Sequence, residues 1–133
     1  MLRIEHIGIA VNSLATSVPL FEKLLNCLCY KTEAVESEQV NTAFFWAGNT
    51  KVELLENAGV PGVIASFLEK RGEGMHHIAF EVEDIKAEMQ RLAAQGFTIL
   101  NEVPKKGADN KLVCFLHPKT TNGVLVELCQ EIK

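Results

Sequence analysis

The chain repeats one strand-like stretch, His6–Val11 (HIGIAV) and His77–Val82 (HIAFEV), at an offset of 71 residues. In both copies apolar residues alternate with small or polar ones, which is typical of a β-strand. The same offset carries Leu14 onto Ile85, where a helical pattern follows each strand. We therefore predict an internal duplication, a feature that decides the fold before any other pattern is considered.

Helical and strand patterns continue in parallel through the two copies. Asn12 and Asp84 are cap-type residues that precede the first and last helices, and Pro61 and Gly72 suit the start and stop of a helix between the copies. The predicted helices cover residues 13–26, 61–71 and 85–95. In the first helix the residues expected on one apolar, buried face are Leu14, Val18, Phe21, Leu24 and Leu25. The predicted strands after the helices cover residues 41–47, 51–56, 111–116 and 123–129.

These elements predict an α+β fold made of two tandem βαβββ modules. We expect residues 1–133 to form a single domain. Module 1 would cover about 1–57, a connecting helix about 61–72, and module 2 about 74–133.

The composition excludes several classes of protein. With 133 residues and a formal net charge of −4, the chain lacks the basic surplus of a dedicated nucleic-acid binder. No apolar run approaches the roughly 18 residues that span a bilayer, and the N-terminus lacks the apolar core of a signal peptide. We therefore expect a cytoplasmic protein without nucleic-acid or membrane partners. Its four cysteines, which form no C-x-x-C pair, are expected to be reduced thiols.

The repeat also selects candidate metal ligands. Because side chains alternate between the faces of a strand, His6 and His77 occupy the same face of the two modules. Glu53 and Glu127 lie at matching positions in the closing strands, Val52–Leu55 and Val126–Cys129. Two imidazoles and two carboxylates suit a divalent transition metal. Taken singly, such a histidine can also be a packed residue, and such a glutamate can face solvent.

Several segments carry a resemblance to the vicinal oxygen chelate superfamily and, within it, to the methylmalonyl-CoA epimerases. The run Gly-Glu-Gly-Met-His-His and the run Leu-His-Pro-Lys with Gly-Val-Leu-Val-Glu-Leu are the most particular to the epimerases. The segments that carry the resemblance are His6–Val11, Gly48–Leu55, Lys70–Phe80, Phe115–Lys119 and Gly123–Leu128.

The resemblance implies an isomerase that interconverts the (2R) and (2S) epimers of methylmalonyl-CoA, between propionyl-CoA and succinyl-CoA in metabolism. It implies that the two modules form a curved mixed sheet around a metal site, the vicinal oxygen chelate fold. It also implies a divalent metal ion, cobalt first, with zinc, nickel or manganese as alternatives, and a homodimer. The metal positions of the family fall on His6, Glu53, His77 and Glu127. The family glutamate at Glu127 is both a ligand and an acid/base group.

The chain departs from the family pattern at two positions. A second catalytic glutamate found in some members falls on Thr42, which is not a base. Glu53, or a water molecule, is then left to serve the other face of the substrate. Glu53 is a glutamine in some epimerases, and a carboxylate there resembles glyoxalase I. A glyoxalase I-type lyase acting on a glutathione hemithioacetal and a non-catalytic small-molecule-binding protein are therefore the alternative functions.

Overall fold

The computed structural model describes residues 1–133 and divides them into two compact units. The first unit comprises His6–His76, and the second comprises Met1–Glu5 with His77–Lys133. In both units a strand, a helix and three further strands follow one another along the chain, so the predicted duplication of a βαβββ module is confirmed. That the two units act as a single domain stays a prediction.

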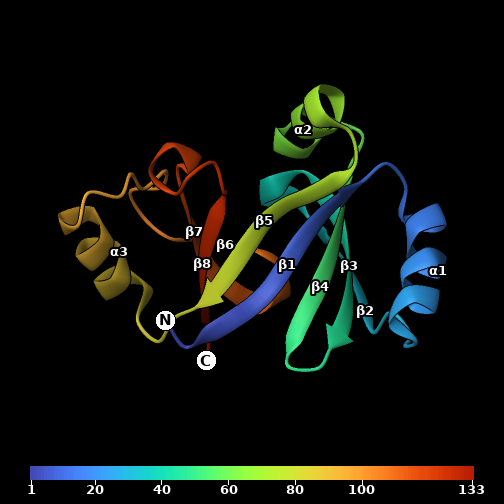
Figure 1. Cartoon of the computed structure of the whole chain (residues 1–133), viewed down its shortest axis with the longest axis horizontal. Helices are drawn as coiled ribbons and strands as arrows, with labels where there is room; N and C mark the ends of the chain where they lie inside the picture. The colour runs from blue at the N-terminus through green and yellow to red at the C-terminus, as the bar shows by residue number, and fades with distance from the viewer. The chain divides into compact units, whose positions relative to one another are not determined.

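The first unit contains a four-stranded mixed sheet in the order β2-β3-β4-β1, with α1 against one face (Figure 1). β1 and β4 are parallel, and the other neighbours are antiparallel. The elements are β1 (Arg3–Val11), α1 (Leu14–Leu25), β2 (Lys31–Val35), β3 (Val40–Ala47), β4 (Thr50–Asn57) and α2 (Val63–Arg71), with a 3-10 turn at Glu36–Glu38.

The second unit repeats this arrangement in the order β5-β8-β7-β6, with β5 and β8 parallel and the other pairs antiparallel. α3 packs against one face of its sheet. The elements are β5 (Gly74–Glu81), α3 (Ile85–Ala94), β6 (Lys105–Lys106), β7 (Lys111–Leu116) and β8 (Val126–Glu131), with 3-10 turns at Ala108–Asn110 and Pro118–Thr120.

Each unit buries an apolar core between its sheet and its helix. Leu54 of β4 and Leu128 of β8 occupy equivalent positions in these cores, and both are completely buried. Around Leu54 lie Val11, Ala43 and Phe45, with Leu14, Val18, Phe21 and Leu25 packed on them. Around Leu128 lie Val82, Ile85, Met89, Leu92, Cys114 and Leu116. Side chains alternate between the two faces of a strand. The residues directly before and after Leu54 and Leu128 therefore point to the sheet face away from the helix.

The helix starts differ from the predictions in two places. Ser13, not Asn12, caps α1, because its side-chain oxygen accepts a hydrogen bond from the Thr16 N–H. The connecting helix begins at Val63 rather than Pro61, because Gly62 is the extended N-cap residue. Asp84 and the stop at Gly72 are confirmed.

Two further expectations are wrong. Leu24, expected on the buried face of α1, is 69% exposed. β8 begins at Val126 rather than at Gly123, because Asn122 and Gly123 both have positive φ, which a strand does not allow. None of the helices is long and apolar enough to cross a membrane.

Candidate functional site

The first unit brings His6 and Glu53 together on the sheet face away from α1. His6 shares this face with Gly8 and Ala10, as its place in the strand predicts, and Gly8 is the neighbour of Glu53 in the parallel β1–β4 pair. The Nε2 atom of His6 lies 3.4 Å from Oε1 of Glu53. Both side chains are buried, so the pair replaces water contacts with a contact inside the protein.

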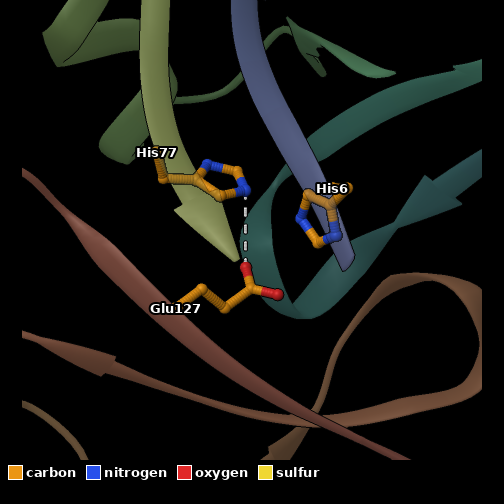
Figure 2. Close-up of side chains that lie close together, drawn as sticks. All are labelled: His6, His77 and Glu127. Atoms are coloured by element: carbon orange, nitrogen blue, oxygen red, sulfur yellow. Dashed lines mark ion pairs between the residues drawn. The ribbon is translucent and has the colours of Figure 1, made fainter. Parts of the chain in front are cut away.

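The second unit holds an equivalent pair. His77 of β5 and Glu127 of β8 point toward one another, with Nε2 3.5 Å from Oε1 (Figure 2). Both residues are buried, and Ala79 is the neighbour of Glu127 across the parallel β5–β8 pair. The duplication therefore gives each unit one imidazole–carboxylate pair with nearly the same separation.

The separation within each pair suits two ligands of one metal ion. Ligand atoms about 2.1 Å from one ion lie about 3.0 Å apart when they are at right angles, as in six-coordination, and about 3.4 Å apart in tetrahedral directions. The observed separations of 3.4 and 3.5 Å are close to both values. Imidazole nitrogen with carboxylate oxygen is a donor set that zinc, cobalt, nickel and manganese accept in different degrees. The residues in each unit are therefore chemically suited to a divalent transition metal.

A phenylalanine and a lysine accompany each pair, and sequence reasoning did not place either lysine beside its pair. Phe44 lies opposite Glu53 in the antiparallel register, and Phe115 lies opposite Glu127. The Nζ atom of Lys31 lies 5.9 Å from the Phe44 ring centroid, and Nζ of Lys105 lies 5.9 Å from that of Phe115. Such distances allow a cation–π attraction. The signal in the sequence was a lysine at the start of the first strand after the helix in each module, Lys31 of β2 and Lys105 of β6.

Thr42, which lies at the position of the family's second glutamate, has a structural role. Its side chain is 1% exposed, and its hydroxyl donates a hydrogen bond of 3.0 Å to the Glu33 carbonyl oxygen. This bond fixes β2 against β3. Lys51, which lies two residues before Glu53 on the same face, is buried with its Nζ 5.1 Å from the Trp46 ring centroid.

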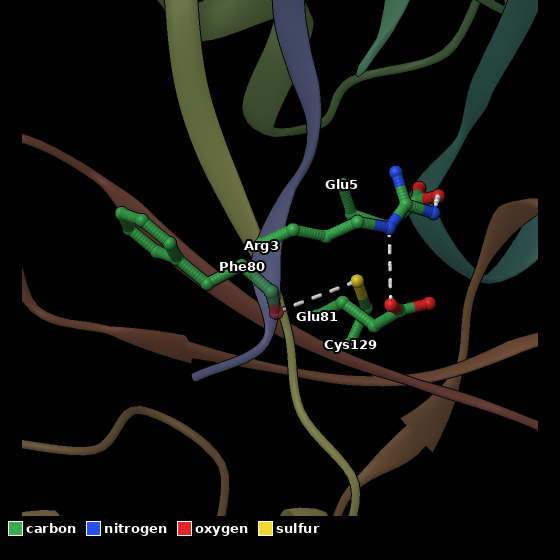
Figure 3. A network of polar contacts seen from close by, with 5 residues as sticks. All are labelled: Arg3, Glu5, Phe80, Glu81 and Cys129. Carbon is green, nitrogen blue, oxygen red and sulfur yellow. Dashed lines mark hydrogen bonds and ion pairs between the residues drawn. The ribbon is translucent and has the colours of Figure 1, made fainter. Parts of the chain in front are cut away.

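Besides its histidine–glutamate pair, the second unit contains a network of polar contacts around Arg3 and Glu81 (Figure 3). Arg3 donates to Glu81 at 3.1 Å and approaches the buried Glu5 at 3.4 Å. The Cys129 thiol donates to the Phe80 carbonyl oxygen at 3.5 Å. Burial, with the Glu127 and Glu5 charges, raises the pKa of Cys129 well above its usual range. This thiol is therefore not a nucleophile at neutral pH.

The other histidines are held in local contacts. The ring of His76 meets that of Phe67 edge-on, with centroids 5.0 Å apart. Nδ1 of His117 accepts a hydrogen bond from the Lys119 N–H in the Pro118–Thr120 turn.

Comparison with known proteins assigns the fold to a class. Residues 5–115 match the family model of the Glyoxalase/Bleomycin resistance protein/Dioxygenase superfamily, so the chain belongs to that superfamily and has the vicinal oxygen chelate fold expected from its sequence. Within the superfamily the chain belongs with the methylmalonyl-CoA epimerases, which are enzymes of the isomerase class.

Three relatives resemble this chain over nearly its whole length. The ethylmalonyl-CoA/methylmalonyl-CoA epimerase of Cereibacter sphaeroides is 42% identical over 130 residues, which cover 96% of this chain and 97% of the relative. The uncharacterized protein YqjC of Bacillus subtilis is 42% identical over 98% of this chain and 93% of its own length. A variant of the Streptomyces coelicolor methylmalonyl-CoA epimerase in complex with 2-nitronate-propionyl-CoA has a TM-score of 0.94 and 32% identity, with 100% of this chain and 99% of that chain covered.

Proposed function

We propose that this protein interconverts the (2R) and (2S) epimers of methylmalonyl-CoA by proton transfer at C2, with the help of a divalent metal ion. The observation that carries the proposal is the occurrence of one buried histidine–glutamate pair in each half of a chain that belongs with these epimerases. The complex of the Streptomyces coelicolor relative with an acyl-CoA analogue supports an acyl-CoA substrate.

We assign the metal ligands to His6, Glu53, His77 and Glu127. The similar separations within the two pairs, 3.4 and 3.5 Å, and their equivalent positions in the repeat support this assignment. Four protein ligands leave a six-coordinate ion two positions for substrate. Cobalt is our first choice, followed by zinc, nickel or manganese, because these ions accept the same donors.

The chemistry explains why such a site is needed. The C2 proton lies between a thioester and a carboxylate, and its removal builds negative charge on the thioester oxygen. A bound divalent ion supplies the positive charge that stabilises this enolate. Glu127 takes the C2 proton on one face, since a carboxylate within hydrogen-bond reach of C2–H is a natural general base.

Epimerisation also needs a group that delivers a proton to the opposite face. Glu53 and a water molecule are the two groups that the sequence leaves for this role. Glu53→Gln separates them: if epimerisation survives with the metal bound, Glu53 is a ligand and not the second base.

The primary test is hydrogen exchange at C2 of methylmalonyl-CoA in D2O, followed by mass spectrometry with and without a chelator. We expect metal-dependent deuterium incorporation, and a loss of about 100-fold or more in the rate of epimer interconversion in Glu127→Gln. Glu131→Gln is the matched control, because Glu131 lies on the same strand but is exposed. Metal content is measured in each variant.

The outcome also separates the alternative functions. A folded, metal-loaded protein that exchanges no C2 proton would refute the epimerase, and the hemithioacetal of methylglyoxal and glutathione would then test the glyoxalase I-type lyase. A protein that binds no metal would favour the non-catalytic binding protein. Ethylmalonyl-CoA is a second substrate to assay, since the Cereibacter sphaeroides relative is named for it.

The remaining parts of the proposal concern the setting of the enzyme. We infer that the two units act together as one domain, that the protein forms a homodimer, and that it works in the cytoplasm between propionyl-CoA and succinyl-CoA. Sedimentation of the metal-loaded protein tests the dimer.

A further inference from the structure

The site face of the first unit carries a carboxylate that the assignments above do not use. Glu33 of β2 is half-buried, whereas its neighbours Thr32 and Ala34 are exposed. The antiparallel register places Glu33 opposite Thr42, and Thr42 opposite Leu55. Since paired residues point to the same face of a sheet, Glu33 belongs to the face that carries His6 and Glu53.

The surroundings of Glu33 direct its carboxylate toward that face. Its Oε1 lies 3.4 Å from Nζ of Lys31, and the same Nζ lies 5.9 Å from the ring centroid of Phe44, the register partner of Glu53. Two strand spacings and a shift of two residues put the Cα atoms of Glu33 and Glu53 about 12 Å apart.

Small, buried residues lie beside Glu53 on this face. Gly8 and Ala10, the register partners of Glu53 and Leu55 on β1, are the smallest residues of the face. Glu33 lies on β2, on the same face and two strands away from Leu55 of β4. An acyl group anchored near Glu53 would therefore be approached by Glu33 across Thr42, whose own hydroxyl is engaged with a backbone carbonyl.

We propose that Glu33 is the acid/base group for the second face of C2, with Glu53 serving as a metal ligand. Apart from Glu53, which is buried against His6, Glu33 is the carboxylate among the strand residues of this face. This assignment rests on the proposed epimerase function.

The proton balance is simple. The Glu127 carboxylate takes the C2 proton as the C–H bond breaks, and the electron pair moves into the enolate. Protonated Glu33 then donates its proton to the opposite face of C2, which forms the new C–H bond and leaves Glu33 ionised. Exchange with water restores both groups. The reverse reaction uses the same two residues with their roles exchanged.

The test is Glu33→Gln, assayed on each separated epimer in D2O by mass spectrometry and by a stereospecific measurement of epimer composition. We expect interconversion to slow by about 100-fold or more. One epimer should still take up deuterium through Glu127 with retention of configuration, while the other becomes inert. Glu127→Gln should show the opposite selectivity between the epimers.

Three further variants define the role. Glu33→Asp keeps the carboxylate and should recover part of the rate. Lys31→Gln removes the same ion pair and should reduce interconversion by less than tenfold. Glu36→Gln, at an exposed residue of the following turn, should leave both activities unchanged. Metal content and the melting temperature should match those of the wild-type protein in all four.

Each other result overturns the assignment. Wild-type interconversion by Glu33→Gln would show that Glu33 transfers no proton. Equal loss of exchange from both epimers would show a structural role instead of a face-specific one. Absence of exchange with the wild-type protein would remove the epimerase function itself, and this outcome is visible before any variant is made.

Discussion

The duplicated cores allow a sharp test of whether the two units unfold as one domain. Leu54 and Leu128 occupy equivalent positions in the two units, and both are completely buried. Leu54→Ala and Leu128→Ala therefore remove the same apolar groups from equivalent places. If the units unfold together, the two variants should lower one shared melting temperature by similar amounts.

The magnitude follows from burial and chain length. A fully buried Leu→Ala substitution costs about 3 kcal/mol, within a usual range of about 2–5 kcal/mol. An unfolding entropy of about 2.1 cal/mol/K per residue gives about 280 cal/mol/K for 133 residues, so the melting temperature should fall by about 11 °C. A unit of about half that length unfolding alone would lose about 20 °C, and the other unit would lose nothing.

The assay combines calorimetry with the fluorescence of Trp46, the only tryptophan, which lies in the first unit. In metal-free protein, Leu128→Ala should shift the Trp46 transition as far as Leu54→Ala does, although Leu128 lies in the second unit. Leu24→Ala is the control, because Leu24 is 69% exposed and should change stability by less than about 0.5 kcal/mol. A Trp46 transition unmoved by Leu128→Ala would refute the single cooperative domain.

Two other predictions concern the thiols and the metal. Burial and the Glu127 charge raise the pKa of Cys114 to about 11, so about one thiol in a thousand is ionised at pH 8. Cys114 and Cys129 should resist alkylation until the protein unfolds, whereas the half-exposed Cys27 and Cys29 should react in the native state. Mass spectrometry of the labelled peptides measures this difference. Rapid labelling of Cys114 in the native protein would refute the prediction. Chelation of an ion present at 100 times its Kd should remove about 2.7 kcal/mol of stability. His77→Ala should abolish most of this difference in thermal denaturation, and an unchanged response in that variant would exclude His77 as a ligand.

Much of the fold was accessible from the sequence because the chain is duplicated. The alternation of apolar residues, repeated at a fixed offset, placed His6 and His77 on equivalent strand faces, and the structure confirms these faces. The pairing of each histidine with a glutamate of the same unit follows from the parallel pairing of the first and last strands of a module. The distance between histidine and glutamate in each pair could not be obtained without that register.

Other features depend on contacts that a strand pattern does not encode. Asn12 and Ser13 are both good caps, and only the backbone of the helix entrance decides that Ser13 bonds to Thr16. The loop before β8 was expected to be strand because its apolar residues continue the pattern, but Gly123 donates its N–H to Pro118 in a turn. Glu33 could not be assigned to the site face until the register of β2 against β3 was known.

The repeat explains the proposed ligands, but the reaction itself requires the two halves to differ. A substrate with a thioester at one end of C2 and a carboxylate at the other has no two-fold symmetry. The structure is asymmetric at equivalent register positions of the edge strands: Glu33 lies opposite Thr42, whereas Lys105 lies opposite Val113. One unit thus offers an anion where the other offers a cation. In the proposed mechanism, the equivalent pairs hold the metal, and the residues that diverge around them distinguish the two faces of C2.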